Sequence, residues 1–363
     1  MNISKIGTKE AIYMTLTISI AHTILSMPRN ILLNTKSAFI LNLVFVCFIL
    51  IGITILVVKL FKNFPGLDIL DISEYLGGKN FKKIVGLFFI SYFIISSSIL
   101  LREFCEAINI LYYPMTNIFF VILFFIIAIA VTNKLELSAT LKTNFIIVPL
   151  VLISNIFLFI ANIKNFNYAT IYPILGESFT DTFVLGISNI YSFSSITALY
   201  ILPPLLKKVQ DLKKISIISV VVYIIYLILT ICTLSFMFSY FMVEDSVLPL
   251  YTAARYIQIG TFFVRLESIF LLIWIILFAC YLSIACKFSM LVFKKITNIK
   301  ESKVLAYPFA ILILGISLIP QTFASVKNYE TEIYPYVSIG FNYIFCILLL
   351  IFANLKRRKE RKS

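Results

Sequence analysis

Ten stretches of the chain contain no Asp, Glu, Lys or Arg over 18 to 29 consecutive residues. This feature limits the possible folds, because a membrane-spanning helix needs roughly 20 mostly apolar residues. The strands of a membrane barrel are about ten residues long and alternate in polarity, whereas these stretches are continuously apolar. We therefore predict ten transmembrane helices, over residues 11–28, 37–58, 84–101, 107–133, 143–163, 182–206, 215–243, 268–286, 304–326 and 333–355.

The composition excludes the other broad classes of protein. The 363 residues are 61% hydrophobic and 13% charged, against about 45–50% and about 25% in soluble domains. Disordered chains have low hydrophobicity, which excludes that class as well. The six cysteines lie in or beside predicted spans without CxxC or metal-ligand spacing, so we interpret them as packing residues. The first stretch has no small-residue cleavage site and runs into Met27-Pro28-Arg29, so we predict a span there and no signal peptide.

The net charge of +14 is explained by the orientation of the spans. Both ends of the chain and the loops after spans 2, 4, 6 and 8 carry 24 Lys and Arg residues, whereas the alternate loops carry 5. By the positive-inside rule, both termini are predicted to be cytoplasmic. The basic tail 356–363 then faces anionic lipids of the bilayer. No nucleic-acid partner is expected, because the chain has no soluble domain with interleaved basic and aromatic residues.

Ten helices can be divided into two sets of five, about residues 10–163 and 182–355, within one membrane domain that spans residues 1–363. Because five is an odd number, the second set runs in the opposite sense, which is the inverted repeat of many transporters. Pro28 near the end of the first span and Pro203 near the end of the sixth correspond under this symmetry, and polar residues precede both. We therefore expect helices 1 and 6 to be interrupted at a binding site. The alternative is an ordinary helix end at proline.

The sequence contains no pattern of an enzyme, a metal site or a cofactor site. A single histidine excludes His-based triads and multi-His metal sites. The stretch 77–80 (Gly-Gly-Lys-Asn) lacks the first glycine and the Ser/Thr of a phosphate-binding loop. We therefore expect no enzymatic activity and no cofactor. No Asp or Glu lies in the middle of a predicted span, which favours a sensor that changes shape over a proton-coupled pump.

Polar residues in predicted helices 1, 3, 6 and 8 indicate a small cavity in the middle of the membrane. The N-termini of half-helices at such a cavity face an anionic group, such as a carboxylate. The alternative is interhelical packing, which small and hydroxyl side chains also favour. The candidate ligand-binding residues are Ala21, His22, Thr23, Tyr92, Ser96, Ser192, Ser194, Ser195, Cys280 and Tyr281.

Charged residues at helix ends, together with Pro28 and Pro203, form a second group with a structural or gating role. Arg102 and Glu106 are four residues apart and can pair on one helix face. Arg265 and Glu267 are two apart and cannot face each other, so each is expected to contact another element. Helix-end ion pairs or snorkelling arginines explain these positions, and the alternative is a gate or a subunit contact.

Five short motifs together resemble one known family. They are Ile18–Arg29, Phe64-Pro65 with Ile72–Leu76, Leu101–Glu106, Tyr172–Gly176, and Phe263–Phe270 with Trp274. In this order they resemble the spore-germination permease family, the B subunits of germinant receptors, within the amino acid–polyamine–organocation transporter superfamily. The resemblance implies the LeuT-like fold, a small germinant such as an amino acid, and receptor A and C subunits as partners. It also implies location in the spore inner membrane or the cell membrane.

The chain departs from the family pattern at two places. The family usually has glycines where this chain has Ala21-His22-Thr23, and often an acidic residue where this chain has Thr197. We hypothesise that His22 narrows or tunes the pocket; the alternative is a histidine that bonds a neighbouring helix. The leading interpretation is a germinant-receptor B subunit. The alternatives are an amino-acid permease of the same superfamily and a membrane scaffold without a ligand site.

Overall fold

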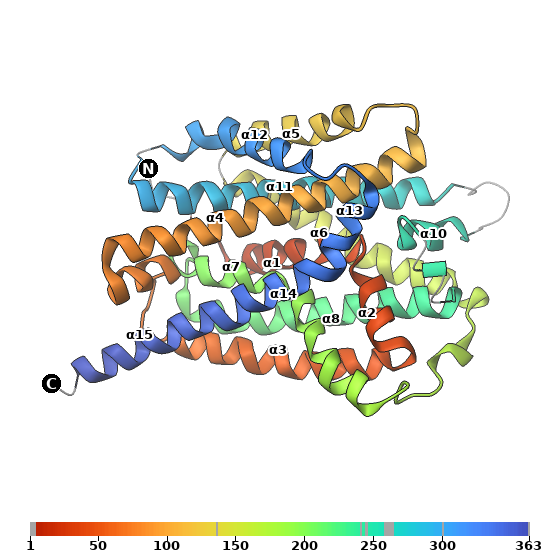
Figure 1. Cartoon of the computed structure of the whole chain (residues 1–363), viewed down its shortest axis with the longest axis horizontal. Coiled ribbons are helices and arrows are strands. Elements are labelled where there is room, and N and C mark those ends of the chain that lie inside the picture. Colours follow the sequence, from red (N-terminus) through yellow and green to blue (C-terminus); the bar gives the residue numbers. More distant parts are fainter. Residues whose placement is uncertain are drawn as a thin grey trace.

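The computed structural model describes residues 5–135, 137–239, 242–243, 246–257, 265–299 and 301–361. The described residues are almost entirely helical, and the β-structure among them is one isolated bridge between Ile6 and Leu206. The long helices lie side by side along the long axis of the molecule (Figure 1). The α-helices are α1 (Thr8–Thr23), α2 (Met27–Thr35), α3 (Phe39–Phe61), α4 (Ile69–Tyr112), α5 (Ile118–Lys134), α6 (Leu137–Ala161), α7 (Ile196–Ile201), α8 (Leu212–Met237), α10 (Pro249–Arg255), α11 (Glu267–Thr297), α12 (Ala306–Ser317), α13 (Phe323–Asn328), α14 (Tyr334–Ser338) and α15 (Cys346–Glu360).

Six helical stretches of the described residues are long and apolar enough to cross a membrane. Two shorter apolar helices, Ile118–Lys134 and Lys303–Ser317, coincide with two further predicted spans. The remaining predicted spans, 11–28 and 182–206, are broken into short helices, so the total of ten stays a prediction. The six stretches are Met27–Phe61, Ile69–Tyr112, Leu137–Ala161, Val209–Met237, Glu267–Thr297 and Phe323–Glu360.

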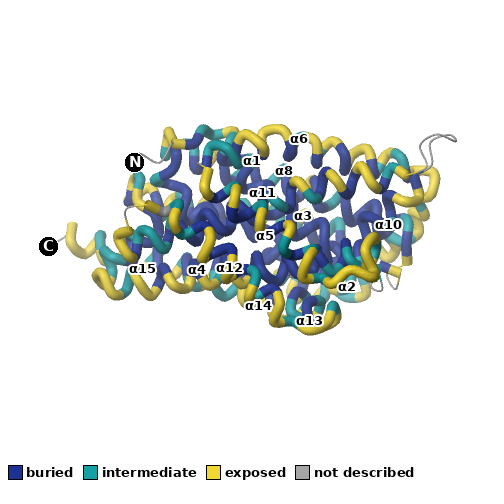
Figure 2. Tube along the Cα trace, turned by 90° about the horizontal axis from the view of Figure 1, so that it is seen from above, coloured by how far each residue is buried: buried dark blue, intermediate teal, exposed yellow. Residues whose placement is uncertain are grey.

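Large apolar side chains cover the outside of the bundle. Phe48 and Ile146, for example, are 71% and 73% exposed, and exposed positions run along the outer helices in Figure 2. A soluble monomer rarely exposes extensive apolar surface. The chain is therefore an all-helical membrane protein.

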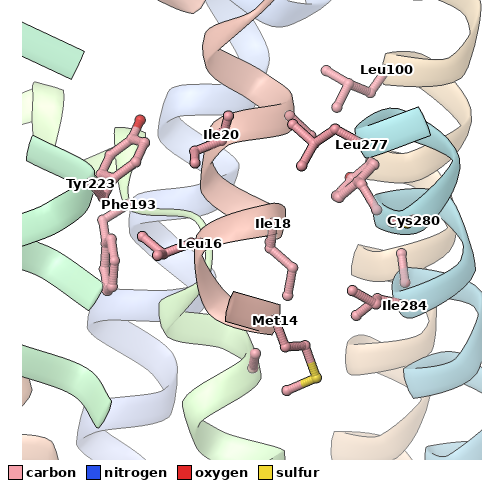
Figure 3. Packing of buried hydrophobic residues seen from close by; sticks show 14 of the residues in the cluster. Met14, Leu16, Ile18, Ile20, Leu100, Phe193, Tyr223, Leu277, Cys280 and Ile284 are labelled. Atoms are coloured by element: carbon pink, nitrogen blue, oxygen red, sulfur yellow. The ribbon is translucent and has the colours of Figure 1, made fainter. Parts of the chain in front are cut away.

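Helix α1 forms the centre of the bundle. Every residue from Met14 to Thr23 is buried, so the helix is enclosed on all sides rather than along one stripe. It packs against α6, α8 and α11. Figure 3 shows aliphatic side chains of α1 facing Leu277, Cys280 and Ile284 of α11 on one side and Phe193 and Tyr223 on the other. This packing fixes the depth and rotation of α1 in the bundle.

Helix α4 begins at a tightly bonded corner and bends once. The Asp68 carboxylate accepts hydrogen bonds from the backbone N–H groups of Leu70 and Asp71, which caps the helix. Lys295 of α11 pairs with Asp68 at 2.7 Å and with Asp71 at 2.6 Å. At Gly78 the backbone turns to φ 77°, which glycine adopts without steric cost. The first turns of α4 are thereby held to α11, while the rest crosses the bundle.

Both ends of the chain lie at the same end of the bundle (Figure 1). There the Ile6 N–H donates to the Leu205 carbonyl at 2.9 Å, and the Lys207 N–H donates to the Ile6 carbonyl at 3.0 Å. Helix α15 continues to Glu360, so most of the basic tail predicted at 356–363 extends the last helix. Lys356 donates to the backbone carbonyl of Tyr75 at 2.7 Å, which holds this extension against α4.

Candidate functional site

The first predicted span is interrupted close to the centre of the molecule. Helix α1 ends at Thr23, residues 24–26 form a turn, and α2 begins at Met27. The sequence places Pro28 at the end of this span, and that detail is wrong. Pro28 occupies the first turn of α2, where its missing N–H needs no helical partner.

The sixth predicted span is interrupted as well. A 3₁₀ segment, Leu185–Ser192, is followed by non-helical residues 193–195 and then by α7. The Tyr343 hydroxyl donates to the carbonyls of Ile190 at 2.7 Å and Phe193 at 3.1 Å, which satisfies two acceptors beside the break. Pro203 lies beyond α7 and opens a 3₁₀ turn, so the proline again does not mark the interruption itself.

The two interrupted segments meet each other. The Ser19 hydroxyl of α1 donates to the Ser195 hydroxyl at 2.9 Å, and the Ser195 backbone N–H donates to Ser19 Oγ at 3.3 Å. Both serines are fully buried. The backbone donor exposed by the break before α7 is therefore satisfied by a side chain of α1, and the two segments are joined at the level of the candidate site.

A small cavity of about 10 Å³ lies beside this junction. A water molecule needs about 10–15 Å³ of such volume, so the cavity has room for no more than one. Rings fill the space around it: His22 stacks on Tyr334 at 5.0 Å between ring centroids and meets Tyr281 edge-on at 5.6 Å. The lining residues are Ile18, His22, Tyr92, Phe93, Ser96, Ser194, Thr197, Tyr281, Ala285 and Tyr334.

Two polar atoms at this cavity have no hydrogen-bond partner among the described residues. They are Ser194 Oγ and His22 Nδ1, and the residues that carry them are each 2% exposed. The other ring nitrogen, His22 Nε2, lies 3.4 Å from the Tyr334 hydroxyl. Since buried polar groups in folded proteins are nearly always hydrogen-bonded, these two atoms are available to a polar group that enters the cavity.

Five of the ten predicted ligand-binding residues line the cavity: His22, Tyr92, Ser96, Ser194 and Tyr281. The other five lie in the same region but outside its lining, and their contacts are internal. Thr23 Oγ1 lies 3.1 Å from the Tyr223 hydroxyl, Ser195 bonds Ser19, and Cys280 packs against α1 (Figure 3). Ala21 and Ser192 are fully buried. The structure thus separates lining residues from residues that hold the segments together.

The C-terminal span contributes cavity residues that the sequence interpretation did not include. Tyr334 lines the cavity, and Asn342 supports it: its Nδ2 donates to the Tyr92 hydroxyl at 2.9 Å, and its Oδ1 accepts from Thr197 Oγ1 at 2.6 Å. Asn342 lies in a π-helical segment, Ile339–Phe345, a form that occurs mainly at functional sites. The sequence feature that could have indicated this residue is an asparagine within an otherwise apolar span.

The predicted charged positions at helix ends differ in their contacts. Arg102 donates from Nε and Nη2 to Glu106 Oε1, at 2.9 and 2.7 Å, so this pair forms as its spacing allows. Arg102 also reaches the Ser317 carbonyl of α12 at 3.3 Å. Arg265 is exposed and Glu267 is buried at the start of α11, and within the described part of the chain neither makes a salt bridge. Residues 263 and 264 of the same motif lie outside the described residues.

A second buried charged group lies next to α2. The Glu103 carboxyl of α4 faces Arg29 and Ser26, and Asn30 Nδ2 donates to the Glu330 carbonyl at 3.2 Å. Arg29, Glu103 and Glu330 are 1%, 2% and 4% exposed. Sequence inspection missed this group because Glu103 and Glu330 fall just outside the uncharged stretches. Buried ionisable groups are costly unless they are paired and hydrogen-bonded.

These features define a class of protein: an α-helical membrane protein with a small cavity where two interrupted helical segments meet. Comparison with known families is more specific. Residues 5–326 match the spore germination protein family. The match covers most of the chain, so the chain belongs to this family of spore germination permeases, and the resemblance carried by the motifs is confirmed. The family is of the transporter and receptor type and is not a known enzyme family. No curated protein matches the sequence.

Proposed function

We propose that this chain is the B subunit of a spore germinant receptor. It binds a small germinant, an amino acid, at the cavity between the interrupted segments and triggers germination together with A and C subunits. Family membership supports the receptor role. The observation that carries the ligand site is the pair of unpartnered polar atoms, Ser194 Oγ and His22 Nδ1, buried at that cavity. They can bond the amino or carboxylate group of an amino acid.

We also propose that the ten predicted spans form the five-plus-five inverted repeat of the LeuT-like fold, with repeats over about 10–163 and 182–355. The two broken segments are the first helix of each repeat, and the bond between Ser19 and Ser195 at their junction supports this correspondence. The 24-to-5 distribution of Lys and Arg supports cytoplasmic termini. Family membership supports location in the spore inner membrane.

Binding at this site requires a change of shape. Ligand pockets usually have volumes of about 300–1,000 Å³, whereas the cavity has about 10 Å³. His22, Tyr281 and Tyr334 therefore have to move apart when a ligand enters. A ligand drives such a change only through its higher affinity for the open shape. A site that opens on binding is suited to a receptor that reports occupancy to other subunits.

The test replaces Ser194, whose hydroxyl has no hydrogen-bond partner among the described residues. Ser194→Ala removes a hydroxyl without a partner, so the thermal midpoint should not fall, while the affinity for the germinant amino acid should fall about tenfold. The control is Ser188→Ala, because Ser188 is half-buried, lies outside the cavity lining, and its hydroxyl donates to the Leu185 carbonyl at 2.7 Å. Equilibrium dialysis of the purified protein with tritiated amino acids measures the affinity. Wild-type affinity in Ser194→Ala, or equal losses in both variants, contradicts the proposed site.

The second candidate is an amino-acid permease, which the interrupted helices favour, since transporters bind substrates at such breaks. Purified protein in liposomes separates the two functions. Uptake of labelled amino acids above the background of empty liposomes supports the permease, whereas binding without uptake supports the receptor. Failure to bind any amino acid supports the third interpretation, a scaffold without a ligand site.

A further inference from the structure

An apolar groove of about 460 Å³ lies directly beside the candidate cavity. It runs between the middle of α4 and the segment formed by α14 and the π-helical residues after it. Phe88 and Val337, at its rim, are 53% and 43% exposed, so the groove opens to the apolar outside of the bundle. Its lining residues are Phe88, Ser91, Tyr92, Ile95, Ser96, Tyr329, Tyr334, Val337, Gly340, Phe341 and Phe345.

The groove and the cavity share a wall. Tyr92, Ser96 and Tyr334 line both spaces. The hydroxyls of Tyr92 and Tyr334 lie 3.4 Å apart, and the Tyr92 ring stacks on Phe341 at 5.0 Å between centroids. His22 and Ser194, which carry the unpartnered atoms, line the cavity on one side of this wall, and aromatic residues line the groove on the other. A rotation of the two tyrosine rings joins the spaces into one site.

We propose that the groove receives the side chain of the bound amino acid, and that the germinant is therefore an amino acid with a large apolar side chain, of the size of leucine or phenylalanine. This inference rests on the proposed function. The cavity alone is too small for an amino acid, whereas the groove has a volume within the usual range of ligand sites. Once the shared wall opens, the joined space places the charged groups of the ligand at the interrupted segments and its side chain among Phe88, Phe341 and Phe345.

Gly340 keeps the groove open. Gly340 lines the groove, and a Cβ atom built at this glycine meets no surrounding heavy atom within 4 Å, so the start of a side chain is accommodated there. Gly315 of α12 has the same open surroundings and does not line the groove. The two glycines therefore provide a matched pair for substitution, since a Cβ atom at either position has open surroundings and only Gly340 lines the proposed subsite.

The experiment measures binding of tritiated leucine to the purified wild-type chain and competition by glycine, alanine, valine and phenylalanine. Wild-type protein should bind leucine and phenylalanine at least tenfold more tightly than alanine, because each added methylene in an apolar pocket contributes a factor of about ten or more. Gly340→Leu should lower the leucine affinity at least tenfold and change the alanine affinity less than twofold. Gly315→Leu should change neither.

Three results overturn the proposal. The first is equal affinity of the wild type for alanine and leucine, and the second is an equal loss for both ligands in Gly340→Leu, as expected if membrane lipid or another helix occupies the groove. The third is an unchanged leucine affinity in that variant. In all three the protein still binds amino acids, so the proposed function survives. If none of the five amino acids binds, the proposed function itself is wrong.

Discussion

Two fully buried asparagines allow the value of the hydrogen bonds at the site to be measured. The Asn342 side chain makes three bonds: to the Tyr92 hydroxyl at 2.9 Å, to Ser338 Oγ at 3.2 Å and from Thr197 Oγ1 at 2.6 Å. Asn144 of α6 is equally buried, but neither its Nδ2 nor its Oδ1 has a partner among the described residues. The same substitution at the two positions should therefore have opposite effects.

Asn342→Leu should destabilise the bundle by about 2 kcal/mol, because side-chain hydrogen bonds in membrane proteins contribute on average about 0.6 kcal/mol each. Asn144→Leu should be neutral or stabilising, because it removes a buried polar group that lacks partners. Leucine has the same branching and the same number of side-chain heavy atoms as asparagine but a larger volume, so the added volume is matched at the two sites.

Unfolding in mixed micelles by increasing amounts of SDS measures both effects. Trp274, the single tryptophan, is buried in α11 and reports the transition by fluorescence. A similar destabilisation in the two variants, or a larger one at Asn144, refutes the assignment of stability to the Asn342 bonds. Because Asn342 positions Tyr92, its loss should also weaken amino-acid binding more than the change at Asn144.

Two further pairs of substitutions test the frame around the site. Gly78→Ala should destabilise the protein by about 1–3 kcal/mol, because φ 77° with ψ −172° is a conformation essentially restricted to glycine. Gly52→Ala within α3 should stabilise it by about 0.5–1 kcal/mol. Thermal midpoints measure both changes, and a gain at Gly78 contradicts the reasoning. Lys295→Met leaves the buried Asp68 without its cation and should cost about 2 kcal/mol. Lys294→Met is the control, because Lys294 forms no salt bridge with any described residue. Unfolding in SDS measures both variants, and equal losses of stability contradict a special role of the salt bridge between Lys295 and Asp68.

Some polar residues within apolar stretches lie around the small cavity, and their role in binding stays a prediction. His22, Ser96 and Ser194 stand out against their neighbours and line the cavity. The prolines predicted the existence of breaks near both segments but misplaced them, because proline is accommodated at the start of a helix as readily as it ends one. The break before α7 instead coincides with Ser195, whose N–H is satisfied by Ser19.

Other parts of the site depend on contacts between helices, which the sequence of a single span does not show. Some predicted residues lie near the cavity, but their side chains contact neighbouring helices: Thr23, Ser195 and Cys280. The sequence does not distinguish a residue that lines a cavity from one that packs between helices. Tyr334 and Asn342 lie in a segment with π-helical turns, which shift the helix face by an extra residue.

The contacts between the first and second interrupted segments have a mechanical consequence. Ile6 is bonded to Leu205 and Lys207 at the end of the bundle, and Ser19 is bonded to Ser195 at the depth of the cavity. Two segments that are hydrogen-bonded at two points along their length cannot slide past each other unless one set of bonds breaks, but they can tilt together. We therefore expect helix α1 and the segment from Ser195 to Lys207 to move as one unit. If this unit tilts when the cavity widens, its other end moves as well, at the end of the bundle where both chain ends lie.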